Sequence, residues 1–360
     1  MANTLAIALL AGALVAFLLV YLAPIARQVG LVDTPNERKR HGRDVPLIGG
    51  IAIGVTFLLA MLLMPYSLRD YRMLFFSIAV LLVVGILDDR KDVSAGVKFL
   101  IEMIVCALLV IIGGVLITDM GDIFARGVSQ GLNILAIPFS ILALVGVINA
   151  FNMIDGHDGL AALTTIVSLT ALTCLCYTTG QLHFVSIFLL LIALTGVFLV
   201  FNICLLGVSK QVFLGDAGSM FLGLVLGYFL IKLIDVPVPS NYVGSQIVIV
   251  KITSAPWILG LPLFDLVVSM VRRVFGMQSI FAADRGHVHH RMTDVGYSKT
   301  FTVVILTLIH IIFVSIGVLG TIMNWPDWIL FWTPFLLVLV YLTYTIHNER
   351  KILSKPWKLN

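Results

Sequence analysis

The stretch that separates two long apolar runs near the middle of the chain reads Asn149-Ala-Phe-Asn-Met-Ile-Asp-Gly-His-Asp-Gly-Leu160. One apolar run covers 134–148 and the next covers 160–177. Placing a carboxylate at the centre of a bilayer costs about 2.5–3.5 kcal/mol on insertion scales, so two aspartates at this junction indicate the edge of a membrane. At such an edge Asp155 and Asp158 can stay ionised and hold a cation or a substrate. The alternative is a polar turn that only joins two helices.

The composition is that of a membrane protein. Hydrophobic residues make up 60% of the 360-residue chain and charged residues only 12%, with a mean hydropathy of +1.07. A soluble domain carries about 25% charged residues, so this composition excludes a soluble protein, and nothing in it indicates nucleic-acid binding. The sequence predicts an all-α polytopic membrane protein in which residues 1–360 form a single integral membrane domain. The four cysteines lie within apolar runs, and we interpret them as small apolar residues.

The apolar runs predict about eleven transmembrane helices, at about 20 residues for each crossing. The predicted spans cover residues 4–26, 47–64, 73–87, 97–117, 134–151, 159–177, 184–206, 218–234, 246–271, 301–322 and 329–346. The first run has no basic segment before it and no convincing cleavage site after it, so we expect a retained span rather than a signal peptide.

The distribution of basic residues predicts the orientation. If the first span runs from outside to inside, 18 of the 23 lysines and arginines fall in the segments that become cytoplasmic. These segments are 27–46, 88–98, 152–158, 207–217, 272–300 and 347–360. We therefore expect the amino terminus outside and the carboxyl terminus inside the cell.

An acidic pair ends the third predicted span. Asp88 and Asp89 are adjacent, and adjacent carboxylates repel each other unless a cation neutralises them. Their hard oxygen ligands suit Mg²⁺ or Mn²⁺. Local ion pairs with Arg90 and Lys91 at a helix end are the alternative.

A second acidic motif, Gly215-Asp-Ala-Gly-Ser219, lies at the start of the predicted span 218–234. A helix amino terminus with small residues suits a phosphate group. Asp216 suits a divalent cation, and a simple helix cap is the alternative. Phe213 either stacks on a ring such as a nucleobase or packs in the core.

The first predicted cytoplasmic loop carries a basic run that includes Lys39 and Arg40. This run either only follows the orientation rule or holds anionic lipid or phosphate at the membrane face.

The longest predicted cytoplasmic loop contains His287, His289, His290 and Arg291. Zn²⁺ is one candidate ligand, but no cysteine or glutamate lies nearby and the flanking arginines disfavour it. Imidazole and guanidinium groups together suit a pyrophosphate better, because guanidinium forks match phosphate oxygens. A surface loop without a role is the remaining alternative.

Within the predicted span 246–271, Asp265 is a functional candidate because an acid inside a membrane is costly. An ion pair with Arg272 or Arg273 is the alternative. The acidic, basic and histidine-rich segments share one predicted membrane face. Together they indicate a carboxylate-rich, metal-assisted phosphate site there.

The combination of these motifs resembles the polyprenyl-phosphate N-acetylhexosamine-1-phosphate transferases. The resemblance runs from about Gly30 to Arg291 and rests on four motifs together. They are Asp88-Asp89-Arg90, Asn149-x-x-Asn152-x-x-Asp155-Gly-x-Asp158-Gly, Phe213-x-Gly-Asp216-x-Gly-Ser219 and His287-x-His289-His290-Arg291. Enzymes of this family move a sugar-1-phosphate from a UDP-sugar to a lipid phosphate and release UMP, with Mg²⁺ or Mn²⁺.

The resemblance implies roles for individual residues. Asp216 and Asp89 are expected to handle the metal, and Asp88 is expected to act with Asp89 in catalysis. Asp155 and Asp158 correspond to catalytic acids of the nucleotide site, and Phe213 to an aromatic residue that contacts uracil. The full set expected to bind substrate is Asn149, Asn152, Phe213, His287, His289, His290, Arg291, Lys39 and Arg40.

The histidine pattern is similar to that of bacterial members that use UDP-N-acetylglucosamine and undecaprenyl phosphate. The product would then be a lipid-pyrophosphate N-acetylglucosamine that starts a surface polysaccharide such as O-antigen, common antigen or teichoic acid. We expect a bacterial inner-membrane enzyme in contact with membrane lipid, with its active site facing the cytoplasm, and the resemblance allows a homodimer. The alternatives are another UDP-N-acetylhexosamine, UDP-MurNAc-pentapeptide or, from another class, a transporter with a metal site at the cytoplasmic face. A four-residue stretch, 207–210, lengthens the segment after Asn202, so no uridine role is carried over to Asn202.

Overall fold

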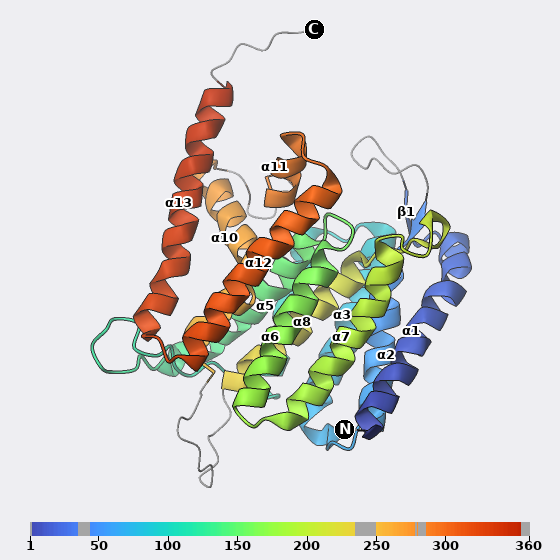
Figure 1. Cartoon of the computed structure of the whole chain (residues 1–360), viewed down its shortest axis with the longest axis horizontal. Coiled ribbons are helices and arrows are strands. Elements are labelled where there is room, and N and C mark those ends of the chain that lie inside the picture. Colours follow the sequence, from blue (N-terminus) through green and yellow to red (C-terminus); the bar gives the residue numbers. More distant parts are fainter. Residues whose placement is uncertain (1, 35–43, 235–249, 278, 280–285, 354–360) are drawn as a thin grey trace.

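The computed structural model describes the chain apart from residues 1, 35–43, 235–249, 278, 280–285 and 354–360 (Figure 1). The described chain is mostly helical. Its longer helices are α1 (Ala2–Val29), α2 (Gly49–Leu63), α3 (Arg72–Lys91), α4 (Ala95–Ile111), α5 (Ala136–Ile154), α6 (Leu160–Thr178), α7 (Leu182–Asn202), α8 (Gly215–Ile234), α10 (Gly260–Phe275), α12 (Lys299–Ile322) and α13 (Asp327–Leu353).

Short elements connect these helices. They are the helices α9 (Ala255–Ile258) and α11 (Val288–Asp294), the 3-10 turns η1 (Leu68–Tyr71), η2 (Asn133–Leu135), η3 (Val208–Lys210) and η4 (Ile252–Ser254), and the strands β1 (Val32–Asp33) and β2 (Val45–Pro46). The two strands pair antiparallel, with Val32 opposite Pro46.

Helix α8 is the centre of the bundle. Its sequence is apolar on every side, and a helix that is hydrophobic all round is buried in a bundle. Accordingly, 89% of its most apolar window is buried, and α3 and α5 pack most extensively along it. The first turn of α8, which carries Asp216, is therefore held by its neighbours rather than by a free loop.

Glycines let the first turn of α8 touch the backbones of α2 and α3. A Cβ atom on Gly50 of α2 would lie 2.1 Å from the backbone nitrogen of Gly218, and one on Gly85 of α3 would lie 2.2 Å from the Cα of Ala217. No side chain larger than hydrogen fits at these two contacts. Three helices therefore meet without intervening side chains at the start of α8.

The outer helices present apolar side chains where lipid would lie. Only 22% of the most apolar window of α1 and 17% of that of α13 is buried. Figure 1 shows α1 and α13 at opposite edges of the bundle. Their exposed apolar side chains, such as Leu9 and Phe335, are expected for helices in contact with lipid tails.

In the described part of the chain, eight helices are long and apolar enough to cross a membrane, or nine if one bent pair counts as a single span. This establishes a multi-pass membrane protein, but the predicted total of about eleven is not confirmed. The predicted span 47–64 corresponds to the 15-residue α2, and 97–117 to the 17-residue α4. The end of the latter prediction is wrong, because the helix ends at Ile111 and the chain continues without a long helix to η2.

The predicted span 246–271 is wrong as a continuous helix. The chain bends by 88° between the segment 252–258 and α10. Ser168 of α6 donates a hydrogen bond to the freed carbonyl of Ile258 at 2.8 Å, and the freed N–H of Leu261 donates to Nδ1 of His310 in α12 at 3.2 Å. These side chains form hydrogen bonds with backbone groups that a straight helix would pair internally. The bend is therefore stabilised by specific hydrogen bonds.

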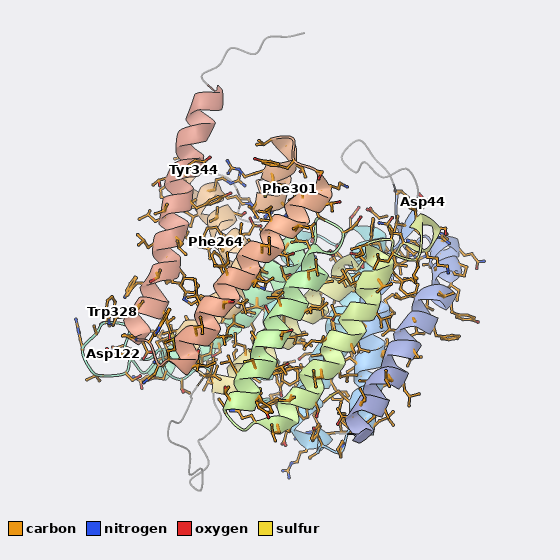
Figure 2. All side chains as sticks on the ribbon, viewed as in Figure 1. Asp44, Asp122, Phe264, Phe301, Trp328 and Tyr344 are labelled. Atoms are coloured by element: carbon orange, nitrogen blue, oxygen red, sulfur yellow. The ribbon has the colours of Figure 1, made fainter. Side chains whose placement is uncertain are left out.

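Different elements lie at the two ends of the bundle. Figure 1 shows the amino terminus at one end, and β1, α11 and the carboxyl end of α13 at the other. Figure 2 places Asp44 at the β1 end and Asp122 at the opposite end. Helix α1 therefore begins at one end of the bundle and α13 ends at the other, while the predicted sides of the two termini stay a prediction.

Candidate active site

Four charged side chains from three helices meet at the end of the bundle that carries β1 and α11. Asp88 and Asp89 lie in the last turn of α3, Lys98 in the first turn of α4 and Asp216 in the first turn of α8. The segment 88–98 is therefore not the loop that the sequence predicted. Asp92, in the left-handed conformation with a φ of 49°, ends α3 and lets α4 begin three residues later.

Lys98 joins two of the carboxylates. Its Nζ lies 2.8 Å from Oδ2 of Asp88 and 2.5 Å from Oδ2 of Asp216. The side chains of Lys98 and Asp88 are only 13% and 12% exposed, so this contact lies largely out of water. The other oxygen of Asp88 accepts the backbone N–H of Val93 at 2.8 Å, which fixes the carboxylate against the α3–α4 turn. A buried cation thus holds two acids that would otherwise repel each other.

Asp89 caps α8 from another helix. Its Oδ1 accepts the backbone N–H of Asp216 at 2.8 Å, and its Oδ2 accepts that of Ala217 at 3.4 Å. These are unpaired N–H groups of the first turn of α8, and a carboxylate there is favoured by the helix dipole. Gly215, with a φ of +73°, brings its backbone against the Asp89 carboxylate. The alternative that Asp216 itself caps α8 is therefore wrong.

The two asparagines lie in the last turns of α5, as the predicted span 134–151 implied for Asn149, whereas the predicted loop 152–158 begins inside the helix. Asn152 donates through Nδ2 to Oδ1 of Asp216 and to Oγ of Ser219, both at 2.9 Å. Asn149 instead donates to Glu102 of α4 and to the carbonyl of Val145. Asn152 is therefore part of the acidic site, whereas the described contacts of Asn149 tie α5 to α4.

The turn after α5 carries Asp155 and Asp158. Burial, together with the charges of Asp216 and Asp89, raises the pKa of Asp155 well above its usual range. Asp158 is exposed and accepts a hydrogen bond from Nε2 of Gln211 at 3.0 Å. The two acids that the sequence grouped together therefore have different environments, one close to the carboxylates of the site and one at its rim.

Asn202 holds this turn to the segment before α8. Its Oδ1 accepts the N–H of Gly159 at 2.5 Å, and its Nδ2 donates to the carbonyl of Val212 at 2.9 Å. Phe213 follows, half-buried, and its backbone pairs with Pro46 and Gly49. The contacts described for Asn202 are structural, in agreement with leaving it without a uridine role.

Histidines from two segments form a cluster beside the acidic turn. The ring centroids of His157 and His289 are 5.0 Å apart, and those of His289 and His290 are 4.2 Å apart. His289 is fully buried, and neither of its ring nitrogens has a hydrogen-bond partner among the described residues. Burial lowers the pKa of His157, and burial with the neighbouring imidazoles lowers the pKa of His289 to about 2. Burial therefore favours the neutral form of His157 and of His289.

Asp265 orients the first histidine of this segment. Its Oδ2 lies 2.8 Å from Nδ1 of His287, and its Oδ1 accepts the N–H of Val288 at 2.9 Å. The predicted loop 272–300 is wrong as a single loop, because it contains the end of α10 and the helix α11, which begins after His287. Asp265 thus fixes both the ring of His287 and the start of α11. The predicted alternative, an ion pair with an arginine, would not by itself position either of them.

Among the described residues, no group of three or more His, Cys, Asp or Glu side chains is arranged to hold a metal ion. The convergent carboxylate oxygens of Asp88 and Asp216 are nevertheless ligands of the kind that Mg²⁺ prefers, and an ammonium group now lies between them. The predicted substrate residues Lys39 and Arg40 lie outside the described residues.

Comparison with known proteins gives the family. Residues 71–234 match the family model described as glycosyl transferase family 4. A Yersinia pestis protein named undecaprenyl-phosphate alpha-N-acetylglucosaminyl 1-phosphate transferase is 31% identical over 329 residues, which cover 91% of this chain and 87% of that protein. Proteins of the same name from Haemophilus influenzae and from Escherichia coli K12 are 34% and 30% identical, covering 92% and 95% of this chain and 91% and 88% of their own.

The chain belongs to glycosyl transferase family 4. The resemblance predicted from the four motifs is thereby confirmed. The matched range contains the acids from Asp88 to Asp216, while the histidine segment lies beyond it. Because the relatives cover most of this chain, the likeness also extends to α10 and α11.

In this glycosyl transferase family 4 chain, the sequence reasoning missed two residues next to the acids. Lys98 counted only as a basic residue of a predicted cytoplasmic segment, although it is the cation that joins Asp88 and Asp216. Glu102, one helical turn further along α4 and only 1% exposed, was not singled out at all. A lysine and a glutamate four residues apart at the start of an apolar run are the signal that could have found both.

Proposed function

We propose that this protein transfers N-acetylglucosamine-1-phosphate from UDP-N-acetylglucosamine to undecaprenyl phosphate. The observation that carries the proposal is the meeting of Asp88, Lys98 and Asp216 at the ends of three bundled helices. A site at the end of a membrane bundle is accessible both to a soluble nucleotide sugar and to a lipid that stays in the membrane. The names of the relatives, which specify this sugar and this lipid, support the same reaction.

The reaction joins two anions. An oxygen of the lipid phosphate attacks the phosphorus that carries the sugar, a new P–O bond forms, and the bond to the phosphate of UMP breaks. UMP leaves with the bridging oxygen, and the lipid carries a pyrophosphate-linked sugar. Catalysis of such a transfer depends on positioning and on positive charge that offsets the phosphates. A phosphate monoester with a second pKa of about 6 is already largely dianionic at neutral pH, so the nucleophile needs little deprotonation.

We assign the metal to Asp216 and Asp88. Both carboxylates already share one cation, the Lys98 ammonium, whereas both oxygens of Asp89 accept N–H groups of α8. This proposal keeps Asp216 as the predicted ligand and favours Asp88 over Asp89 as its partner. A bound Mg²⁺ or Mn²⁺ would supply positive charge for the donor pyrophosphate, and Asp89 would hold α8 so that Asp216 faces it.

The histidine segment is assigned to the donor. The imidazoles of His287, His289 and His290 can donate or accept hydrogen bonds, and Arg291 supplies the positive charge that a pyrophosphate requires. Asp265 keeps His287 in place. Phe213 and the basic pair Lys39 and Arg40 stay proposed contacts of the uracil ring and of lipid or phosphate.

We further propose that this site lies at the cytoplasmic face of a bacterial inner membrane. Of the 23 lysines and arginines, 18 fall in the predicted cytoplasmic segments, which also contain Asp88 and Asp216. The positive-inside rule therefore supports a cytoplasmic position for the acids. The product would start a surface polysaccharide.

Release of UMP by the purified protein tests the proposal. With UDP-N-acetylglucosamine, undecaprenyl phosphate and Mg²⁺, we expect one UMP and one lipid-linked sugar for each turnover, and none without the lipid. UDP-N-acetylgalactosamine and UDP-MurNAc-pentapeptide form the donor panel, and a preference for either would replace the proposed sugar. Uptake of the nucleotide sugar into vesicles without UMP release would contradict the enzyme and favour a transporter.

A further inference from the structure

A basic cavity lies at the end of the bundle opposite the acidic site. It has a volume of about 450 Å³ and is lined by Arg69, Arg72 and Lys232 with the apolar residues Met73 and Ile112. We propose that this cavity binds the phosphate group of an anionic phospholipid. The proposal concerns a second site and goes beyond the transferase reaction.

The cavity and the acidic site are built by the same three helices. Helix α3 carries the acidic pair at its carboxyl end and Arg72 at its amino end, and α8 carries Asp216 at its start and Lys232 near its end. Helix α4 begins near Lys98 and ends beside the cavity. Arg72 and Asp88 are 16 residues apart on α3, so at 1.5 Å per residue the two sites are separated by about 24 Å. A ligand of the cavity is therefore not a substrate of the acidic site.

The basic residues of the cavity are unusual for their place in the chain. Only five of the 23 lysines and arginines lie outside the segments predicted to be cytoplasmic: Arg69, Arg72, Arg126, Lys232 and Lys251. Three of these five line one cavity. The orientation rule explains basic residues at the other end of the bundle but not a cluster at this one.

The cations of the cavity have no ion-pair partner among the residues that the structure describes. Arg72 donates through Nε to the carbonyl of Arg69 at 3.1 Å, and Lys232 donates to the carbonyl of Gly114 at 3.2 Å. Within the described ranges, neither arginine nor Lys232 forms an ion pair, although Asp70 also lines the cavity. By contrast, Lys251 at the same end pairs with Asp327 at 3.1 Å. Among the described lining residues, three cations and one acid leave a net charge of +2 for a ligand to neutralise.

The walls of the cavity favour a lipid over a free anion. Guanidinium and ammonium groups provide several donors for phosphate oxygens. Next to them, Ile111 and Ile112 at the end of α4 are each 64% exposed, as apolar side chains at a lipid boundary are. A phospholipid can place its phosphate on the cations and its acyl chains against these isoleucines, whereas inorganic phosphate gains nothing from the apolar wall.

The test compares three probes on the full-length protein in detergent. Phosphatidylglycerol, phosphatidylcholine and inorganic phosphate are added in turn, and bound ligand is counted by native mass spectrometry while the melting temperature is recorded. We expect the wild type to bind phosphatidylglycerol at least about tenfold more tightly than phosphatidylcholine, since only the former has a net negative headgroup. The double variant Arg72→Gln/Lys232→Gln should lose this preference, and Arg126→Gln, an arginine at the same end but outside the cavity, should keep it.

Three results would overturn the proposal. The first is equal binding of the two lipids by the wild type, and the second is an unchanged preference in the double variant. The third is an equal stabilisation by millimolar inorganic phosphate, which would identify a free-anion site instead. If the double variant does not fold, the single variant Lys232→Gln is measured against the same control, and UMP release verifies that each variant keeps its active end intact.

Discussion

At the scale of single residues, Lys98 is the side chain on which the acidic site depends most directly. Replacing it by methionine keeps much of its apolar stem but removes the charge that joins Asp88 to Asp216. We expect Lys98→Met to lower kcat for UMP release by about 100-fold or more, the size of effect typical for loss of a charge in a preorganised site. Lys91→Met, which removes an exposed charge at the end of α3, is the matched control and should change kcat little. Similar kcat values for the two variants would show that Lys98 is not part of the site.

The acids and the histidine segment should differ in which kinetic step they affect. Asp88→Asn weakens the shared cation site but leaves Asp216 to hold the cation, so we expect a lower kcat with a smaller loss of UDP-sugar affinity than in the histidine-segment variants. His290→Ala or Arg291→Ala should weaken UDP-sugar binding or lower kcat/KM, since a donor contact can also tighten in the transition state. Binding of the UDP-sugar is measured without the lipid. Unchanged donor affinity in both histidine-segment variants, with a large loss of affinity in Asp88→Asn, would reverse the assignment.

The buried histidines predict that the protein is sensitive to acid. Burial holds the pKa of His289 at about 2, far below the ordinary value of about 6.5. Below about pH 6.5 this imidazole binds a proton in the unfolded chain but stays unprotonated in the folded chain. Its contribution to the free energy of unfolding is therefore complete above about pH 6.5 and is lost progressively as the pH falls toward 2. Relative to His289→Gln, we expect the melting temperature of the wild type to drop by several degrees between about pH 7.5 and about pH 5. His289→Gln, which cannot titrate, should show a smaller drop, and an equal drop in both proteins would contradict this explanation.

At the scale of elements, the bend between α9 and α10 depends on partners from two other helices. His310→Leu would leave the N–H of Leu261 buried without its acceptor. Such an unsatisfied group costs about 1–3 kcal/mol, so we expect a lower melting temperature. His183→Leu, an exposed histidine on α7, is the control and should melt like the wild type. Equal melting of both variants would mean that the bend is maintained by packing alone.

At the scale of the whole molecule, the unequal distribution of basic residues predicts which end faces the cytoplasm. Figure 2 places Asp122 at the end of the bundle away from the acidic site, and Ser279 follows α10. In a background in which the four native cysteines are replaced, single cysteines at these two positions should label from opposite sides of the membrane. An impermeant outside reagent should reach only the cysteine at position 122. Labelling of position 279 alone would reverse the orientation and place the acidic site outside.

The sequence allowed the helices and their order to be predicted because each apolar run had to form a helix that satisfies its own backbone. It also indicated the acids of the site, because Asp88, Asp155 and Asp216 interrupt apolar runs where charge is costly. The bend before α10 could not be predicted, since its partners Ser168 and His310 lie about 90 and 50 residues away in the sequence. Such partners become apparent only when α6 and α12 are packed around it.

The residues of the acidic site were easier to predict than the contacts between them. Adjacent acids suggested that Asp88 and Asp89 act together, yet successive side chains of a helix point about 100° apart. In the structure Asp88 turns to Lys98, whereas Asp89 turns to the start of α8. Each acid contacts the helix that packs against its own side of α3. The contact therefore depends on how the helices pack.

The glycine contacts between α2, α3 and α8 have a consequence for drug resistance. A methyl group at Gly50 or Gly85 would overlap the backbone of α8, so the wall that presents Asp216 has almost no tolerated variants. An inhibitor that recognises the backbone of this wall would leave few escape mutations open.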